Sequence, residues 1–240
     1  MEIVIEFQPL NKNENIRLES AMDEFRALAL WMVNNEKNGY LFELIKKHSL
    51  QFAVDIYEQG RVNDKSVDLL FAQMSSVKRA FGIGYQDVQT AKQKQLFIGA
   101  GFWEMRRFIG QMSDAVQLIY EKKPTHIVCA GLSGCVLGEY LGVGLQREYG
   151  YELLVDHMIF ERDGKLPIGG QLKEGFELVG KNILIVEDAV DEARTLGIMT
   201  RVLSGLRGDL TYHLFSLQIE NNNQVQQVLE GMESVICFSE

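Results

Sequence analysis

The chain has 240 residues, enough for one or two domains, and its 46 % hydrophobic and 24 % charged residues are typical of a globular protein. Thirty-three acidic residues against 24 Lys and Arg give a formal charge of −9. This argues against nucleic acid or an anionic membrane as a partner, because both are bound through clustered positive charge. The acid excess is uneven, since residues 1–101 carry 12 basic and 13 acidic side chains and residues 102–240 carry 12 and 20.

Cysteine usage and the N-terminus predict a cytoplasmic protein. The three cysteines (Cys129, Cys135 and Cys237) are odd in number and two lie in apolar runs, which is typical of reduced intracellular thiols. No cysteine or histidine pair has the spacing of a zinc site. The first ten residues lack the basic stretch and cleavage site of a signal peptide, and no apolar run approaches the roughly 20 residues that span a bilayer.

The first hundred residues carry mainly helical periodicity. An alternating segment at residues 1–7 predicts a short strand. Apolar residues then recur every three or four positions over 18–32, 40–57 and 67–81, which predicts three helices, and FGIGY at 81–85 predicts a loop. We therefore expect a mostly helical N-terminal region at residues 1–101.

The second half alternates between strand and helix patterns. Helices are predicted at residues 102–122, 136–145, 196–206 and 225–229, strands at 126–130, 151–160, 182–186, 210–217 and 235–239, and a polar, glycine-rich loop at 163–177. This order predicts an α/β fold, a mainly parallel sheet flanked by helices, over residues 102–240. Ligands of such sheets bind beyond the carboxyl ends of the strands, where AGLSG (130–134) and EDAVDEART (187–195) are the candidate loops.

The loop at residues 187–195 begins with two adjacent carboxylates, Glu187 and Asp188, and leads into a helix that we expect to begin near Ala193. Unpaired amides at a helix start suit a phosphate, and Thr195 adds a hydroxyl. The carboxylates could accept hydrogen bonds from a sugar diol or hold a divalent cation. Equally, the acids of this loop could simply cap the helix and favour its dipole.

The stretch ILIVEDAVDEARTL (residues 183–196) resembles the ribose-phosphate signature of type I phosphoribosyltransferases: an apolar strand, two acids, two apolar residues, Asp or Thr, Thr, Gly, any residue, and Thr or Ser. AGLSG stands where that family has its diphosphate-binding loop. FERDGK, residues 160–165, precedes a glycine-rich stretch, as the family's mobile catalytic loop does. The resemblance covers residues 102–240 and implies that residues 1–101 form a hood over the acceptor site or a dimer surface.

The resemblance also implies roles for the matching residues. Glu187 and Asp188 would hold the ribose hydroxyls of phosphoribosyl diphosphate, and Asp191 would lie near the base as a proton-transfer group. Arg162 or Lys165 would close over the leaving diphosphate. The residues expected around the 5′-phosphate are Asp191, Glu192, Ala193, Arg194 and Thr195. Those expected to present amides to the diphosphate are Leu132, Ser133 and Gly134.

The implied activity is Mg²⁺-dependent transfer of ribose 5-phosphate to a nitrogen nucleophile, a nucleobase above all, with release of diphosphate. Mg²⁺ would be held through the ligand, with Glu187 and Asp188 as candidate protein ligands, and the enzyme would be a homodimer. The chain departs from the family in having Glu192-Ala193 where Thr-Gly is usual. Alanine restricts the backbone, and an inward carboxylate at Glu192 would repel the phosphate.

Three other interpretations use the same residues. The domain could keep the fold and bind a nucleotide or phosphorylated sugar as a non-catalytic regulator. A two-component receiver would need more chain than the 53 residues after Glu187. An α/β-hydrolase elbow (Gly-x-Ser-x-Gly) is nearly matched at residues 131–135, but Cys135 replaces the last glycine, and we expect it to be a packed thiol without a basic neighbour.

Overall fold

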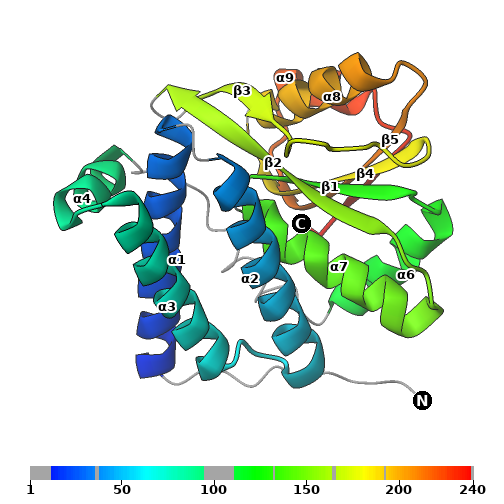
Figure 1. Ribbon diagram of the computed structural model, residues 1–240. Coiled ribbons are helices and arrows are strands. Elements are labelled where there is room, and N and C mark those ends of the chain that lie inside the picture. The colour runs from blue at the N-terminus through cyan, green and yellow to red at the C-terminus, as the bar shows by residue number, and fades with distance from the viewer. Residues whose placement is uncertain are drawn as a thin grey trace. The chain divides into compact units, whose positions relative to one another are not determined.

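The computed structural model describes residues 12–35, 38–94, 111–131, 133–163, 166–191 and 193–238 (Figure 1). The chain divides into two compact units, Met1–Ile98 and Gly99–Glu240. The strand predicted at residues 1–7 lies outside the described residues, and so does the first part of the helix predicted at 102–122. Among the described helices, none combines the length and the apolar character that a membrane span requires.

The first unit is helical, as predicted. Its helices are α1 (Lys12–Asn34), α2 (Asn38–Gln59), α3 (Asp64–Phe81) and α4 (Tyr85–Lys94), and the first three confirm the predicted helices. The periodic apolar side chains form the buried core of this unit: Leu28, Met32, Ile45, Phe52, Leu70 and Met74. Asn63 caps α3 by accepting a hydrogen bond from the amide of Lys65 at 2.9 Å, and Gly82 ends it in the left-handed conformation. The loop predicted at residues 81–85 is present as the short turn between α3 and α4. Helix α4 was not predicted.

The second unit contains a six-stranded sheet in the order β3-β2-β1-β4-β5-β6. Every pairing is parallel except β2 with β3, which confirms the predicted mainly parallel α/β fold (Figure 1). The strands are β1 (His126–Ala130), β2 (Leu154–Asp163), β3 (Leu166–Gln171), β4 (Asn182–Val190), β5 (Thr211–Ile219) and β6 (Ser234–Cys237). The helices are α6 (Met112–Lys122), α7 (Ser133–Tyr149), α8 (Arg194–Leu206) and α9 (Asn223–Leu229).

Helices cover both faces of this sheet because the central strands are apolar on both sides. In β1, Cys129 lies against α7, where a Cβ added to Gly138 would stand 2.1 Å from its Sγ. The neighbouring residues Val128 and Ala130 belong instead to the core that includes Leu196 of α8. All five residues of β1 are buried, as expected for a strand enclosed between two helical layers.

Two predictions of local structure in this unit are wrong. Residues 163–177 were expected to form a loop, but Leu166–Gln171 forms the edge strand β3, whose proline and two glycines are typical of loops. As an edge strand, β3 leaves Ile168 63 % exposed. The loop after β4 was expected to begin at Glu187, but β4 continues to Val190 because its backbone stays paired with β5 as far as Ile219.

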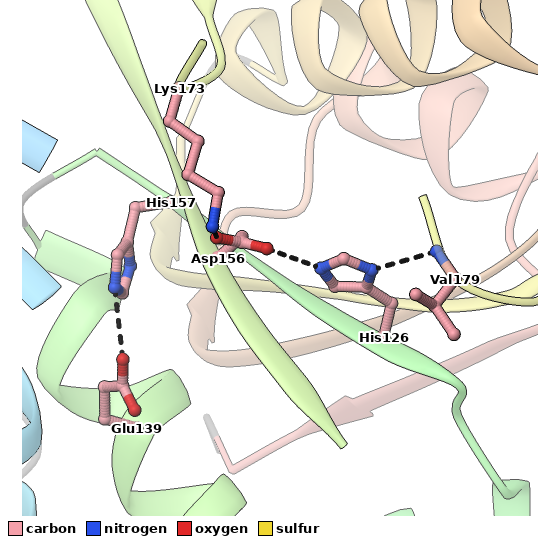
Figure 2. A network of polar contacts seen from close by, with 6 residues as sticks. All are labelled: His126, Glu139, Asp156, His157, Lys173 and Val179. Carbon is pink, nitrogen blue, oxygen red and sulfur yellow. Dashed lines mark hydrogen bonds and ion pairs between the residues drawn. The ribbon is translucent and has the colours of Figure 1, made fainter. Parts of the chain in front are cut away.

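A segment that we call the strap, residues 172–181, connects β3 to β4 and is held by a polar network (Figure 2). Lys173 Nζ lies 2.7 Å from Asp156 Oδ1 in β2, and Asp156 Oδ2 lies 3.1 Å from His126 Nε2 in β1. The amide of Val179 donates to His126 Nδ1 at 3.3 Å, so Nε2 carries the proton that is donated to Asp156. Burial would raise the pKa of Asp156, but the hydrogen bonds from His126 and Lys173 and the charge of Lys173 outweigh it and lower the pKa to about 2.

Candidate functional site

The two candidate loops follow the two central strands of the sheet. From β1 the chain continues toward β2 on one side, and from β4 it continues toward β5 on the other, so the strand order reverses between β1 and β4. In open α/β sheets, ligands bind in the crevice beyond the carboxyl ends of the strands at such a reversal. The topology therefore places both loops at the point of the sheet where a ligand site is expected.

A glycine brings these loops into contact. Gly134, the second residue of α7, lies so close to β4 that an added Cβ would be 2.5 Å from the carbonyl oxygen of Val186 and 3.5 Å from Cα of Glu187. Any side chain at position 134 would force the start of α7 away from β4. The register agrees, because Cys129 near the end of β1 pairs with Val186, directly before the paired acids.

The paired acids are strand residues with buried side chains. Glu187 and Asp188 are 7 % and 5 % exposed, and Ser216 of β5, opposite Glu187, donates through Oγ to the carbonyl oxygen of Asp188 at 3.3 Å. Carboxylates are kept in such surroundings when they accept hydrogen bonds or face a cation. Within the described part of the chain, no group of three or more His, Cys, Asp or Glu side chains could hold a metal ion by itself. Two carboxylates are nevertheless a fitting donor set for Mg²⁺, which is commonly held by one or two carboxylates together with phosphate oxygens of a substrate.

Helix α8 begins where predicted, after a strained turn. Ala193 has φ 56° and ψ 4°, in the left-handed region that favours glycine, and its carbonyl oxygen accepts the first helical bond, from the amide of Gly197 at 2.8 Å. This conformation costs an alanine about 1–2 kcal/mol. The first-turn amides after Ala193 have no acceptor within the helix, so they suit a phosphate. The alanine that stands in place of the signature's glycine thus adopts a conformation that glycine adopts without strain.

The other residues predicted around the phosphates differ in exposure, and two of them lie outside the described residues. Asp191 and Arg194 are exposed and Thr195 is partly exposed, whereas Glu192 lies outside the described residues. Leu132 also lies outside them, while Ser133 and Gly134 form the first two residues of α7. Two of the three amides expected to bind diphosphate, those of Ser133 and Gly134, therefore belong to a helix start rather than to a free loop.

Of the two cationic residues in the predicted catalytic loop, the structure describes the backbone of Arg162. Arg162 stands in β2, pairs with Pro167 of β3 and follows a register shift at Glu161, whereas Lys165 lies outside the described residues. Beyond Met158, the last residue paired with β1, strand β2 continues for five residues, or roughly 16 Å. The hairpin of β2 and β3 thus projects past the carboxyl end of β1.

Sequence reasoning missed a buried cluster of thiols, imidazole and carboxylate behind the first loop. Cys129 and His157 are register partners on β1 and β2, and His157 Nε2 lies 3.2 Å from Glu139 Oε1 of α7 (Figure 2). Cys135, four residues before Glu139 on α7, donates through Sγ to the carbonyl oxygen of Gly131. The imidazole interacts with both thiols, so the expectation that Cys135 has no basic neighbour is wrong.

The burial and the pKa values of this cluster indicate a structural role rather than a catalytic one. Burial raises the pKa of Cys129 to about 12, which keeps it a thiol and chemically inert. Burial lowers the pKa of His157, but the interactions of its imidazole with Cys135, with Cys129 and with the accepting carboxylate of Glu139 outweigh burial and raise the pKa well above its usual value. All four side chains are at most 4 % exposed, which argues against a hydrolase nucleophile at Cys135. The spacing of Cys135 and Glu139 was visible in the sequence, but their proximity to His157 depends on strand register.

No family model matches the chain, and no curated protein sequence does. Among solved structures, it is similar to the xanthine-guanine-hypoxanthine phosphoribosyltransferase of Helicobacter pylori, with 16 % identity over 55 % of this chain and 85 % of that one and a TM-score of 0.39. Adenine phosphoribosyltransferase from Saccharomyces cerevisiae has 15 % identity over 54 % of this chain and 77 % of that one, with a TM-score of 0.39. Hypoxanthine-guanine phosphoribosyltransferase from L. donovani has 20 % identity over 53 % of this chain and 78 % of that one, with a TM-score of 0.38. At TM-scores below 0.5, these structures do not assign the chain to a family.

Proposed function

We propose that the second unit binds phosphoribosyl diphosphate and transfers its ribose 5-phosphate group to a nitrogen nucleophile, with a nucleobase as the favoured acceptor. The observation that supports this most is the contact of Gly134 with β4 at Val186 and Glu187. This contact brings the start of α7, whose amides suit a diphosphate, next to the buried carboxylates of Glu187 and Asp188, which suit a ribose diol. The start of α8, suited to the 5′-phosphate, follows the same strand.

Each part of the ligand has a matching group at this edge of the sheet. In the proposal, Glu187 and Asp188 accept hydrogen bonds from the ribose hydroxyls, and the first-turn amides of α8 bind the 5′-phosphate. The amides of Ser133 and Gly134 bind the diphosphate. Asp191 is proposed to exchange a proton with the acceptor. Two helix N-termini thus offer partial positive charge to the two anionic ends of one ligand.

Mg²⁺ is the proposed cofactor, held by the ligand's own oxygens and by Glu187 and Asp188. It would supply positive charge that offsets the diphosphate as the bond to the ribose breaks. The residues of the chain would hold the ribose between fixed phosphate sites, which aligns the nucleophile with the reacting carbon. Arg162 or Lys165 of the hairpin would neutralise charge on the departing diphosphate.

Binding is tested by comparing two Asp→Asn variants. Asp188→Asn should weaken binding of phosphoribosyl diphosphate in the presence of Mg²⁺ at least tenfold, because a charge-assisted hydrogen bond contributes about 1.5–3 kcal/mol. Asp209→Asn is the matched control, since Asp209 is an exposed acid paired with Lys181 beyond the other end of α8. Equal affinities of the two variants would show that the ribose site is elsewhere.

Catalysis is tested separately by measuring diphosphate release over a panel of nucleobases and other amines. Release that requires one acceptor supports a transferase in this chain. Tight binding without release over the whole panel would favour the alternative function, a regulator that binds a phosphorylated sugar or nucleotide. The homodimer and the cytoplasmic location are further parts of the proposal, and sedimentation of the free protein tests the first of them.

A further inference from the structure

The turn between β5 and α9 is bonded to the segment that leads into α8. The amide of Glu220 donates to the carbonyl oxygen of Val190 at 3.0 Å. Asn222 Nδ2 donates to the carbonyl oxygen of Asp191 at 2.8 Å, while its Oδ1 accepts from the amide of Val225 at 3.0 Å. One side chain therefore caps α9 and also fixes the backbone two residues before Ala193.

The backbone at Ala193 needs such support. A non-glycine residue in the left-handed region persists only where its surroundings hold it there. The Ala193 side chain is buried in the apolar core with Leu196, which holds it from one side. The bond from Asn222 fixes the chain that enters the turn, and the bond from Gly197 to the Ala193 carbonyl fixes the chain that leaves it.

We propose that Asn222 is a positioning residue, which through its bond to the Asp191 carbonyl keeps Ala193 in its strained conformation, so that the first turn of α8 is ready for an anionic ligand. Its effect on phosphate binding rests on the proposed function. Its effect on the turn does not, so the two can be measured apart. Neither the signature resemblance nor the paired acids point to this residue, which lies 27 residues after Thr195 in the sequence.

Asn222→Asp separates the two bonds of this side chain. Aspartate caps a helix as well as asparagine does, so α9 keeps its cap, but the donor to the Asp191 carbonyl is lost. Hydrogen exchange of the ligand-free protein should then show about tenfold faster exchange at the Gly197 amide, with the Val225 amide unchanged. Asn221→Asp is the matched control because it adds the same charge one residue earlier, where the side chain accepts from Gln226 of α9.

The Ala193→Gly background distinguishes positioning of the turn from a general loss of stability. Glycine adopts the left-handed conformation without strain, so Asn222→Asp should change Gly197 exchange by less than about twofold in that background. Phosphoribosyl diphosphate affinity should follow the same pattern, with a loss of about fivefold to tenfold for Asn222→Asp and recovery when Ala193→Gly is added.

Unchanged Gly197 exchange in Asn222→Asp, or equal acceleration in both backgrounds, would overturn the proposal. Failure of the unaltered protein to bind phosphoribosyl diphosphate would instead overturn the proposed function, and the exchange measurement would still decide the role of Asn222.

Discussion

Among the described residues, two that are not glycine adopt positive φ, Lys123 and Ala193, and each begins or ends a helix. Ala193 opens α8 at the candidate phosphate site, and Lys123 closes α6 three residues before β1 begins at His126. The strain at both positions is offset locally. The Ala193 side chain lies in the core, and the Lys123 ammonium stands 3.0 Å from the centre of the Tyr120 ring.

Replacing Ala193 by glycine should leave stability nearly unchanged. Relief of the left-handed conformation contributes about 1 kcal/mol, and loss of the buried methyl costs about 0.8 kcal/mol. Ala115→Gly is the control, because Ala115 is equally buried but lies inside α6, where glycine costs about 1 kcal/mol beyond the lost methyl. Urea unfolding that showed equal losses for the two variants would contradict the strained turn.

Lys123 should respond differently to alanine and to glycine. Lys123→Ala loses the contact with the Tyr120 ring and keeps the strain, for a cost of about 0.5–1 kcal/mol in the free energy of unfolding. Lys123→Gly loses the same contact but relieves the strain, so its stability should lie within about 0.5 kcal/mol of the unaltered protein. The exposed neighbour Lys122 gives the control substitution, Lys122→Ala. Equal effects of alanine and glycine at position 123 would contradict this account.

At the scale of elements, the strap is tied to the sheet by a network separate from the candidate site. Asp156 joins His126 of β1 to Lys173 of the strap, and Phe176 packs on the His126 ring with the centroids 5.3 Å apart. These contacts fix the chain between the hairpin and β4. The strap is therefore held against β1 and β2 directly before the chain enters β4, which carries the paired acids.

The strap makes stability depend on acid pH through Asp156. Its pKa of about 2 in the folded protein lies below the ordinary 3.8, so its contribution is complete above about pH 4 and is lost as the pH falls toward 2. The difference in unfolding free energy between the unaltered protein and Asp156→Asn should shrink by roughly 2 kcal/mol between pH 6 and pH 2.

Asp209 provides the contrast for this measurement. Hydrogen bonds from Lys181 and Arg207 also lower its pKa to about 2, but it is exposed. Half-molar salt should therefore abolish the pH-dependent contribution of Asp209 and leave that of the buried Asp156. A salt-sensitive Asp156 contribution, or one that is constant with pH, would contradict the buried network.

Local patterns predicted most of the elements, and long-range pairing explains what they missed. The buried runs at β1 and β4 were visible because both strands are apolar on two faces. Strand β3 was not, because its Pro167, Gly169 and Gly170 are typical of loops, and α4 has few apolar residues to mark a period. The end of β4 was misplaced because Glu187 and Asp188 read as loop residues, whereas pairing with β5 keeps them in the strand.

The candidate site was predictable in outline for the same reason. Its two loops each follow a recognisable strand, so their sequence order implied a common edge. The contact of Gly134 with Val186 and the approach of His157 to Cys135 depend on strand order and register, which no single stretch of sequence contains. The bond of Asn222 to the Asp191 carbonyl is likewise a long-range contact that the local sequence does not predict.

At the scale of the whole molecule, the acidic second half and the proposed anionic ligand have to be reconciled. Residues 102–240 carry 20 acidic and 12 basic side chains. The structure offers two helix N-termini to the ligand, and two of the acids, Glu187 and Asp188, lie buried at the end of the central strand. The proposal therefore requires a divalent cation between the acids and the ligand.

Removal of Mg²⁺ should accordingly weaken binding of phosphoribosyl diphosphate by at least tenfold. Without the cation, the carboxylates and the diphosphate repel each other, and like charges about 4 Å apart cost on the order of 4 kcal/mol at an effective dielectric of 20. Titrations in excess chelator, with and without restored Mg²⁺, measure the change. Affinity independent of Mg²⁺ would place the diphosphate away from the paired acids.

Calorimetric titration of the full chain with phosphoribosyl diphosphate and Mg²⁺ tests the central claim most directly. We expect saturable heat for one site per chain, with a dissociation constant below 1 mM, which corresponds to about −4.1 kcal/mol. Absence of heat at millimolar ligand would contradict the proposed site.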